Sequence, residues 1–147
     1  MTSTDAHTDI IADTSPAEQA AIRRRLDEIW VAAAARDFDL LESYHRYGPT
    51  FTAFKEGARR DDAASTAAGE RALFSVMEGP AVDMRDLAVN VYGDVAIATF
   101  NGHFTGAIRG NPVAVDQQTT MVFVNDAGDW KIVHEHLSPL VVPRAVV

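Results

Sequence analysis

A short segment near the carboxyl end, Trp130–Ser138, places a glutamate between two histidines. This segment is predicted to be a strand, in which successive side chains point to opposite faces. His134 and His136 therefore share one face, and Glu135 lies on the other face among apolar neighbours. Paired imidazoles can bind a metal ion or move protons. A poorly solvated carboxylate has a raised pKa, which suits it to general acid or base catalysis.

Two glutamates are the candidate catalytic residues. Glu135 is the first, because its predicted apolar surroundings should raise the pKa of its carboxyl toward neutrality. Glu70, on a predicted helix, is the second. Tyr44 and Tyr47 could donate phenol hydrogen bonds to an oxyanion that develops on a substrate.

Both glutamates also have a purely structural interpretation. Glu135 could lie at the edge of the sheet and pair with Lys131, which lies two positions away on the same face of the strand. Glu70 could be a solvated helix residue that pairs with Arg71 or Arg60. Perturbed titratable groups mark functional sites only in a statistical sense, so both interpretations stay open at this point.

The turns of the last two hairpins predict a register for the sheet. The turn at 109–112 places Ile108 opposite Val113, and the turn at 125–129 places Val124 opposite Trp130. A one-residue change of register would move a whole strand to the other face.

The histidines allow two interpretations in this register. His103, on a neighbouring strand, could join His134 and His136 in a three-nitrogen zinc site. The three could instead hydrogen-bond polar side chains on the same face, namely Asn101, Gln118 and Thr120. We expect the second arrangement and therefore no metal. His7 and His45 have no partner visible in the sequence.

Three helices are predicted ahead of the sheet. The first starts at Ser15-Pro16 and runs to about Arg36, the second lies between Asp37 and Gly48-Pro49, and the third opens at Asp61 or Asp62 and closes at Gly79-Pro80. Thr50–Lys55 alternates like a short strand, and a period of two then follows over 82–92, 95–108, 113–124 and 130–137. This order predicts an α+β fold with the helices on one face of an antiparallel sheet.

Composition limits the class of protein further. The 147 residues suit one domain, the absence of cysteine excludes disulfide and thiolate chemistry, and a net charge of -8 argues against nucleic-acid binding. Residues 1–14 contain no Lys, Arg or long apolar run, so we expect no membrane partner and a cytoplasmic location. The predicted organisation is a flexible N-terminal arm at 1–14, a single domain at 15–138 and an apolar C-terminal tail at 139–147.

Several of these segments resemble a known family. Trp130–Ser138, preceded by Thr120–Phe123, is similar to the last hairpin of SnoaL-like proteins and of the calcium/calmodulin-dependent protein kinase II association domain. Both belong to the nuclear transport factor 2-like superfamily. The resemblance continues upstream in Arg36–Phe38, Tyr44, Phe51–Phe54 and Glu70–Phe74, and it spans roughly Pro16 to Ser138. It implies a cone-shaped, curved antiparallel sheet wrapped around three N-terminal helices, with a pocket inside and a dimer interface outside.

The resemblance also implies which face lines the pocket. In the kinase association domain, cavity arginines occupy positions that match Met121 and Leu137, which share a face with Glu135. The helix position that matches Glu70 lines the same cavity. Because Met and Leu replace the basic residues, the resemblance implies an apolar ligand met by acids. The predicted substrate-binding residues are Tyr44, Tyr47, Phe54, Phe74, Phe100, Met121, Phe123 and Leu137.

We therefore expect a small-molecule pocket protein that works as an enzyme without a cofactor. Its chemistry would be acid/base catalysis of a cyclisation, isomerisation or dehydration of a largely apolar metabolite. The alternatives are a non-catalytic ligand-binding or oligomerisation module and a metal-dependent hydrolase that uses the histidines. We also expect a homodimer, formed by an apolar patch on the outer face at Ile97, Val122, Val124, Trp130 and Ile132.

Overall fold

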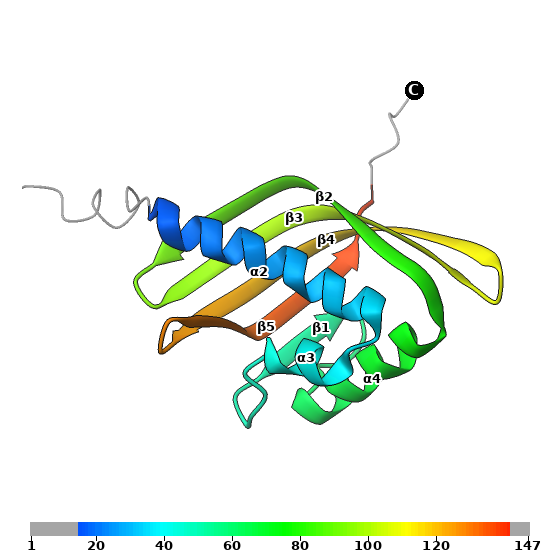
Figure 1. The fold of residues 1–147 in the computed structure, drawn as a ribbon, viewed down its shortest axis with the longest axis horizontal. Helices are drawn as coiled ribbons and strands as arrows, with labels where there is room; N and C mark the ends of the chain where they lie inside the picture. Colours follow the sequence, from blue (N-terminus) through cyan, green and yellow to red (C-terminus); the bar gives the residue numbers. More distant parts are fainter. Residues whose placement is uncertain (1–14, 142–147) are drawn as a thin grey trace, which may run out of the picture.

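The computed structural model describes residues 15–141 as a curved sheet with helices against one face (Figure 1). The predicted arm at 1–14 and residues 142–147 of the predicted tail lie outside the described residues. The elements in chain order are α2 (Pro16–Ala35), α3 (Phe38–Ser43), β1 (Thr52–Lys55), α4 (Ala63–Val76), β2 (Met77–Tyr92), β3 (Val95–Ile108), β4 (Asn111–Asp126) and β5 (Asp129–Pro139).

Helix α2 packs along the concave face of the sheet (Figure 1). Its buried residues recur at helical spacing and form one apolar stripe, namely Ile22, Leu26, Ile29, Ala32 and Ala33. The helix ends where Arg36 adopts a left-handed conformation with φ 56°. Asp37 then starts α3 by accepting a hydrogen bond from the Leu40 backbone N–H.

Helix α4 begins and ends close to the predicted positions. Asp62 is its N-cap and accepts a hydrogen bond from the Ser65 backbone N–H at 2.8 Å. The helix stops at Val76, three residues before the predicted Gly79-Pro80 boundary. Gly79, with φ 57°, instead lies in an irregularity of β2 between Glu78 and Ala81. A left-handed glycine followed by proline therefore bends a strand here and does not terminate a helix.

The sheet has the order β1-β5-β4-β3-β2. Strands β2 to β5 form an antiparallel meander, as the sequence predicts, and the short β1 is added in parallel beside β5. The predicted α+β fold class, with a curved sheet wrapped around N-terminal helices, is confirmed. The core between α2 and the sheet also contains Phe51, Val89, Val91, Ala96, Ala98, Phe100, Phe123 and Ile132.

The β3–β4 hairpin is tighter than the predicted one. Ile108 pairs with Asn111 and not with Val113, because the turn uses only Arg109 and Gly110, both with positive φ. The change is two residues, so the faces are as predicted but the rows differ. His103 consequently lies opposite Asp116, and its Nδ1 is 2.8 Å from the Asp116 Oδ1.

Strand β5 contains a bulge that the sequence analysis missed. His134 pairs with Val122 but Ile132 pairs with Phe123, so Val133 is an extra residue on β5. The alternation of side chains between the two faces shifts by one residue at the bulge. Ile132 therefore lies on the inner face together with Glu135. The prediction that Trp130 and Ile132 share the outer face with the histidines was wrong, since both are buried in the core.

Candidate active site

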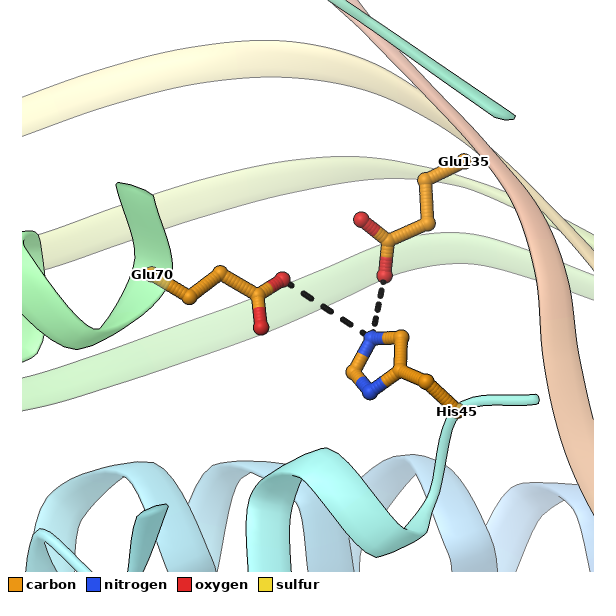
Figure 2. A group of neighbouring side chains, drawn as sticks. All are labelled: His45, Glu70 and Glu135. Carbon is orange, nitrogen blue, oxygen red and sulfur yellow. Dashed lines mark hydrogen bonds and ion pairs between the residues drawn. The ribbon is translucent and has the colours of Figure 1, made fainter. Parts of the chain in front are cut away.

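Four charged side chains meet inside the concave face of the sheet. His45 follows α3, Lys55 lies on β1, Glu70 on α4 and Glu135 on β5. Figure 2 shows His45, Glu70 and Glu135 pointing toward one another from these three separate segments. We call these four residues the charged cluster.

The backbone fixes two members of the cluster directly. The residues on either side of His45 are tied to β5, because the Ile132 N–H donates to the Tyr44 carbonyl and the Arg46 N–H donates to the Ile132 carbonyl. Glu135 pairs with Ala53 of β1, and Lys55 stands two residues further along that strand on the same face.

Glu70 reaches the cluster from the inward side of α4. Thr66, one turn earlier, is buried, and Phe74, one turn later, packs its ring against Trp30 of α2 at 5.9 Å. Residues four apart on a helix share a face. The carboxylate of Glu70 is thus held on the face of α4 that meets the sheet.

A short hydrogen bond joins His45 to Glu135. The His45 Nδ1 lies 3.0 Å from the Leu41 carbonyl oxygen, and because that oxygen can only accept, Nδ1 carries a proton and donates. The Nε2 lies 2.9 Å from Glu135 Oε1 and 3.8 Å from Glu70 Oε1. One proton is therefore shared between the His45 imidazole and the Glu135 carboxylate.

Lys55 and Tyr47 complete the surroundings of Glu70. The Lys55 Nζ is 3.6 Å from Glu70 Oε1 and 3.6 Å from Glu135 Oε2. The Tyr47 hydroxyl donates to Glu70 Oε2 at 3.5 Å, and its ring stacks on the His45 ring with centroids 4.7 Å apart. Two carboxylates, one imidazolium and one ammonium give the cluster a balanced charge.

The two carboxyl groups differ in their proton affinity. Burial would raise the pKa of Glu135, but the hydrogen bond and charge of His45, together with Lys55, lower it. Burial and the nearby charge of Glu135 raise the pKa of Glu70 by more than His45 and Lys55 lower it. Glu70 is thus the carboxyl of the cluster whose pKa lies above its ordinary value.

His45 and Tyr47 also have raised pKa values. Burial alone would lower the pKa of His45, but the hydrogen bond to Glu135 and the charges of Glu135 and Glu70 raise it. Burial and the charge of Glu70 raise the pKa of Tyr47, so its phenol stays protonated and can donate a hydrogen bond. His45 and Glu135 therefore form an imidazolium–carboxylate pair.

The members of the charged cluster also differ in how much of their surface is exposed to solvent. His45 and Glu135 are sealed, with 5% and 3% of their surface exposed. The side chains of Glu70 and Lys55 are 14% and 29% exposed. A molecule that enters from solvent meets Glu70 and Lys55 first.

The structure overturns part of what the sequence predicts for the glutamates. Glu135 does lie on the inner face, but its pKa is lowered and not raised, because His45 and Lys55 lie beside its carboxylate. Neither neighbour was expected from the sequence. The structural interpretations were wrong as well. The Lys131 Nζ is 4.0 Å from Asp129, and the guanidinium groups of the two arginines proposed as partners of Glu70 contact Glu42 and the Phe54 ring.

Two of the predicted substrate-binding residues lie away from the cluster. Tyr44 packs under the guanidinium of Arg25, 4.3 Å from the ring centroid. Phe54 alternates with Ala53 and Lys55 on β1, so it lies on the outer face, where its ring is 5.5 Å from that of His136. The others lie on the cluster side of the sheet, on α4 or in the segment between α3 and β1: Tyr47, Phe74, Phe100, Met121, Phe123 and Leu137.

His45 and Lys55 are the site residues that sequence reasoning missed. Lys55 was visible in principle, because it follows Ala53 at strand spacing in a segment predicted as a strand. His45 carried no signal, since it lies outside any helix or named strand and 90 residues before its partner Glu135. A short segment between elements has no periodicity from which to infer its direction.

The outer face carries a separate polar hollow of about 340 Å³. Its lining includes Asp86, Thr99, Asn101, Gln118, Thr120, His136 and Ser138. In the described residues the histidines do not make the predicted hydrogen bonds to Asn101, Gln118 and Thr120, and they do not gather as the alternative zinc site would require. His103 instead pairs with Asp116, and the His134 Nδ1 lies 2.8 Å from the Thr52 hydroxyl. Within residues 15–141, Asp86 and His136 form no ion pair with each other, and this hollow lacks the acid–base pair that the cluster has.

The cluster itself is the arrangement closest to a metal site. Ligand atoms of His45, Glu70 and Glu135 lie within 4.8 Å of one another, and the second His45 nitrogen is held by a carbonyl, as in many metal sites. The ammonium of Lys55, however, already lies between the two carboxylates. A divalent cation would have to expel the His45 proton and approach this positive charge.

We accordingly expect the purified protein to need no metal. Elemental analysis should find zinc well below one atom per chain, and treatment with a chelator should leave the Tm unchanged. A Tm that falls with the chelator and recovers with zinc would show that a metal ion replaces Lys55 as the balancing charge.

Comparison with known protein families identifies the family of this chain. The SnoaL-like domain model matches residues 22–143. The chain belongs to the SnoaL-like domain family. No curated protein sequence matches it. In the described residues of this SnoaL-like domain, no helix is long and apolar enough to cross a membrane.

Solved structures share the fold at low sequence identity. A candidate dehydratase of the NTF2-like family from Streptomyces avermitilis is 18% identical, with a TM-score of 0.79 over 88% of this chain and 100% of that one. An NTF2-like superfamily protein from Salmonella enterica serovar Typhimurium is 17% identical, with a TM-score of 0.78 over 90% and 97% of the two chains. The S. rosetta hub of calcium/calmodulin-dependent protein kinase II is 24% identical, with a TM-score of 0.69 over 88% and 100%. These similarities establish the fold.

Proposed function

We propose that this SnoaL-like domain is a cofactor-independent, cytoplasmic enzyme that transfers a proton on a small, largely apolar metabolite. Glu70 is the catalytic acid or base. The observation that carries the proposal is the combination of a raised pKa and partial exposure at this one carboxyl. A carboxyl with these properties can take a proton from bound substrate and return it elsewhere.

Glu135, His45 and Tyr47 act as positioning residues for Glu70. Glu135 is ionised and buried, so its negative charge disfavours ionisation of Glu70 and makes that group a stronger base. His45 holds Glu135 in place through the 2.9 Å hydrogen bond. Tyr47 donates to Oε2 of Glu70, so Oε1, which lies 3.6 Å from the Lys55 Nζ, is the oxygen proposed to take the proton.

Proton transfer at carbon is common to the three reactions that the family resemblance suggests. Isomerisation and cyclisation move a proton from one atom to another, and dehydration removes a proton and a hydroxyl from adjacent carbons. The Streptomyces avermitilis candidate dehydratase has the same fold. We therefore favour dehydration or isomerisation among the three.

Deuterium exchange tests the proposal without knowledge of the natural substrate. The protein should accelerate exchange of the α-protons of 4-phenyl-2-butanone and of related ketones, aldehydes and thioesters in D2O, followed by proton NMR. The rate should rise with pH through the raised pKa of Glu70, because only the ionised carboxylate is a base. A rate equal to that in buffer for every member of this set contradicts the proposal.

A second candidate function is assembly or ligand binding without catalysis. The similarity to the kinase hub favours it, since a hub is an assembly domain by name. The outer face retains an apolar strip for this purpose at Val95, Ile97, Val122 and Val124. We propose that this strip joins two copies of the chain in a homodimer.

The apolar strip gives a direct test of assembly. Light scattering at micromolar concentration should report a dimer, and Val122→Arg should convert it to a folded monomer, because an isologous contact places the new charge near its own copy. Asp116→Asn, on the polar part of the same face, is the matched control and should stay dimeric. A wild-type monomer would rule out the dimer.

A further inference from the structure

Lys55 has a role in this site that the acid/base assignment does not use. Its Nζ is 3.6 Å from a carboxylate oxygen of both Glu70 and Glu135. A direct N–H···O hydrogen bond measures about 2.7–3.2 Å, so the ammonium is attracted to both carboxylates without bonding closely to either. Its N–H groups can still donate to a third acceptor, and its side chain is the most exposed in the cluster.

The base and the cation of this site lie side by side. Glu70 Oε1, which is not the oxygen held by Tyr47, is the oxygen next to the Lys55 ammonium. A proton removed by Glu70 therefore leaves negative charge on a substrate within reach of a fixed positive charge. That juxtaposition suits a substrate in which the acidic C–H and the atom that takes up the charge are neighbours, as in a carbonyl compound.

We propose that the Lys55 ammonium binds the carbonyl oxygen of the substrate, and that the substrates are neutral carbonyl compounds with an acidic C–H beside the C=O group. This inference rests on the proposed function of Glu70. It adds the class of substrate and an electrophilic residue.

The reaction balances without an oxidant, a reductant or another reactant. The α C–H bond breaks, its proton goes to the Glu70 carboxylate, and its electron pair forms the C=C bond of an enolate whose oxygen faces Lys55. In a β-hydroxy compound the enolate then re-forms C=O, and the electron pair of its C=C bond becomes a double bond between the α and β carbons as the β C–O bond breaks. The departing hydroxide takes the proton from Glu70 and leaves as water. In an isomerisation Glu70 returns the proton to a different carbon.

Charge balance selects neutral carbonyl compounds over carboxylates. The cluster holds two negative and two positive groups. A neutral ketone, aldehyde or thioester preserves this balance throughout, because Glu70 becomes neutral as the enolate forms. A substrate carboxylate would add a negative charge beside two existing ones, which costs free energy in a poorly solvated site.

The chain supplies its own control for Lys55. Lys131 is its other lysine, with a side chain 28% exposed compared with 29% for Lys55. Lys131 lies 4.0 Å from the single carboxylate of Asp129 and is outside the cluster. Lys131→Met therefore removes a lysine of similar exposure without touching the proposed site.

Ionisation of 1-phenyl-1,3-butanedione tests the role of Lys55 independently of turnover. Its enolate is recognised by its ultraviolet spectrum, and the pH is varied with protein in excess. Wild type and Lys131→Met should lower the pKa of the diketone by about one pH unit, as a nearby opposite charge does. Glu70→Gln should lower it at least as far, since a competing negative charge is gone. Lys55→Met should abolish the effect.

A second pair of variants covers the case in which Lys55→Met fails to fold. Lys55→Met combined with Glu70→Gln removes one charge of each sign, so the balance of the cluster is kept. The double variant should lack the effect that Glu70→Gln alone retains. Equal effects in these two variants, or an unchanged diketone pKa in wild type, would overturn the proposal. Mass spectrometry that finds the diketone condensed on Lys55 would overturn it too, in favour of an amine nucleophile.

The same experiments separate this inference from the proposed function. If Glu70→Gln loses deuterium exchange while Lys55→Met keeps both exchange and the diketone effect, Glu70 is the base and the role of Lys55 is wrong. If Glu70→Gln keeps full exchange, the proposed function of Glu70 is wrong. The pKa of the diketone then tests only whether Lys55 binds an enolate oxygen.

Discussion

Glu70→Gln should reduce deuterium exchange at a ketone α-carbon by at least about 100-fold, because the amide cannot take up a proton. The amide keeps the shape of the carboxyl and can still accept the hydrogen bond from Tyr47. Binding of an apolar ketone should therefore survive, and the loss should appear in kcat more than in KM.

Glu70→Gln lowers the exchange rate but should not lower the stability of the protein. The folded-state pKa of Glu70 is raised above its unfolded value, so its contribution to stability is fully present below about pH 4.3 and is lost as pH rises through the folded pKa. Above that pKa the wild type holds an unfavourable charge that Gln lacks. Glu70→Gln should thus have an equal or higher Tm than wild type at pH 8, measured by circular dichroism.

Asp116→Asn is the control for both measurements. Asp116 also lies beside an imidazole, with His103 at 2.8 Å, but the pair is on the exposed outer face. This variant should leave exchange and Tm unchanged. Loss of exchange in Asp116→Asn would place the chemistry on the outer face, and retained exchange in Glu70→Gln would remove Glu70 from the reaction.

The sequence predicted the fold well because the fold depends on periodicity and turn chemistry. The apolar residues of α2 recur at helical spacing, and those of β2 to β5 recur with a period of two, so each element buries one of its faces. These patterns can be recognised without knowledge of tertiary contacts. Bulges are not readable in this way. One extra residue at Val133 restarted the alternation of β5, and Ile132 and Trp130 were predicted on the wrong face as a result.

The site was predictable only in part, because a pKa depends on every neighbour in space. The sequence identified Glu135 and Glu70 and placed both inside the cone. It ranked them by their apolar neighbours along the chain, whereas their pKa values are set by His45 and Lys55, which come from a loop and from a different strand. The order of the two glutamates is therefore reversed in our proposal.

Glu135→Gln is the variant with the largest expected effect on stability. Removing one partner of a buried ion pair costs about 3–5 kcal/mol, and the other partner here is the sealed imidazolium of His45. The pKa of His45 should fall in this variant, since the hydrogen bond and charge of Glu135 are what hold it up. Urea denaturation measures the first effect, and an NMR titration of the His45 ring nitrogens measures the second.

The pH dependence of this loss follows from the two pKa directions. The folded pKa of Glu135 is lowered, so its contribution is present above its unfolded value of about 4.3 and is lost as pH falls through the folded pKa. The folded pKa of His45 is raised, so its contribution is present below about 6.5 and is lost as pH rises through the folded pKa. The difference in unfolding free energy between wild type and Glu135→Gln should therefore be largest between about pH 4.3 and 6.5.

A difference that falls neither below about pH 4.3 nor above about pH 6.5 would mean that His45 and Glu135 form no ion pair. The proposed positioning role also predicts a kinetic signature that a purely structural role would not give. Without the negative charge of Glu135, the pKa of Glu70 should fall, since that charge helps to raise it. The rise of the exchange rate with pH should then move to lower pH in Glu135→Gln while Glu70 remains the base. An unmoved profile in a folded variant would leave Glu135 with a structural role alone.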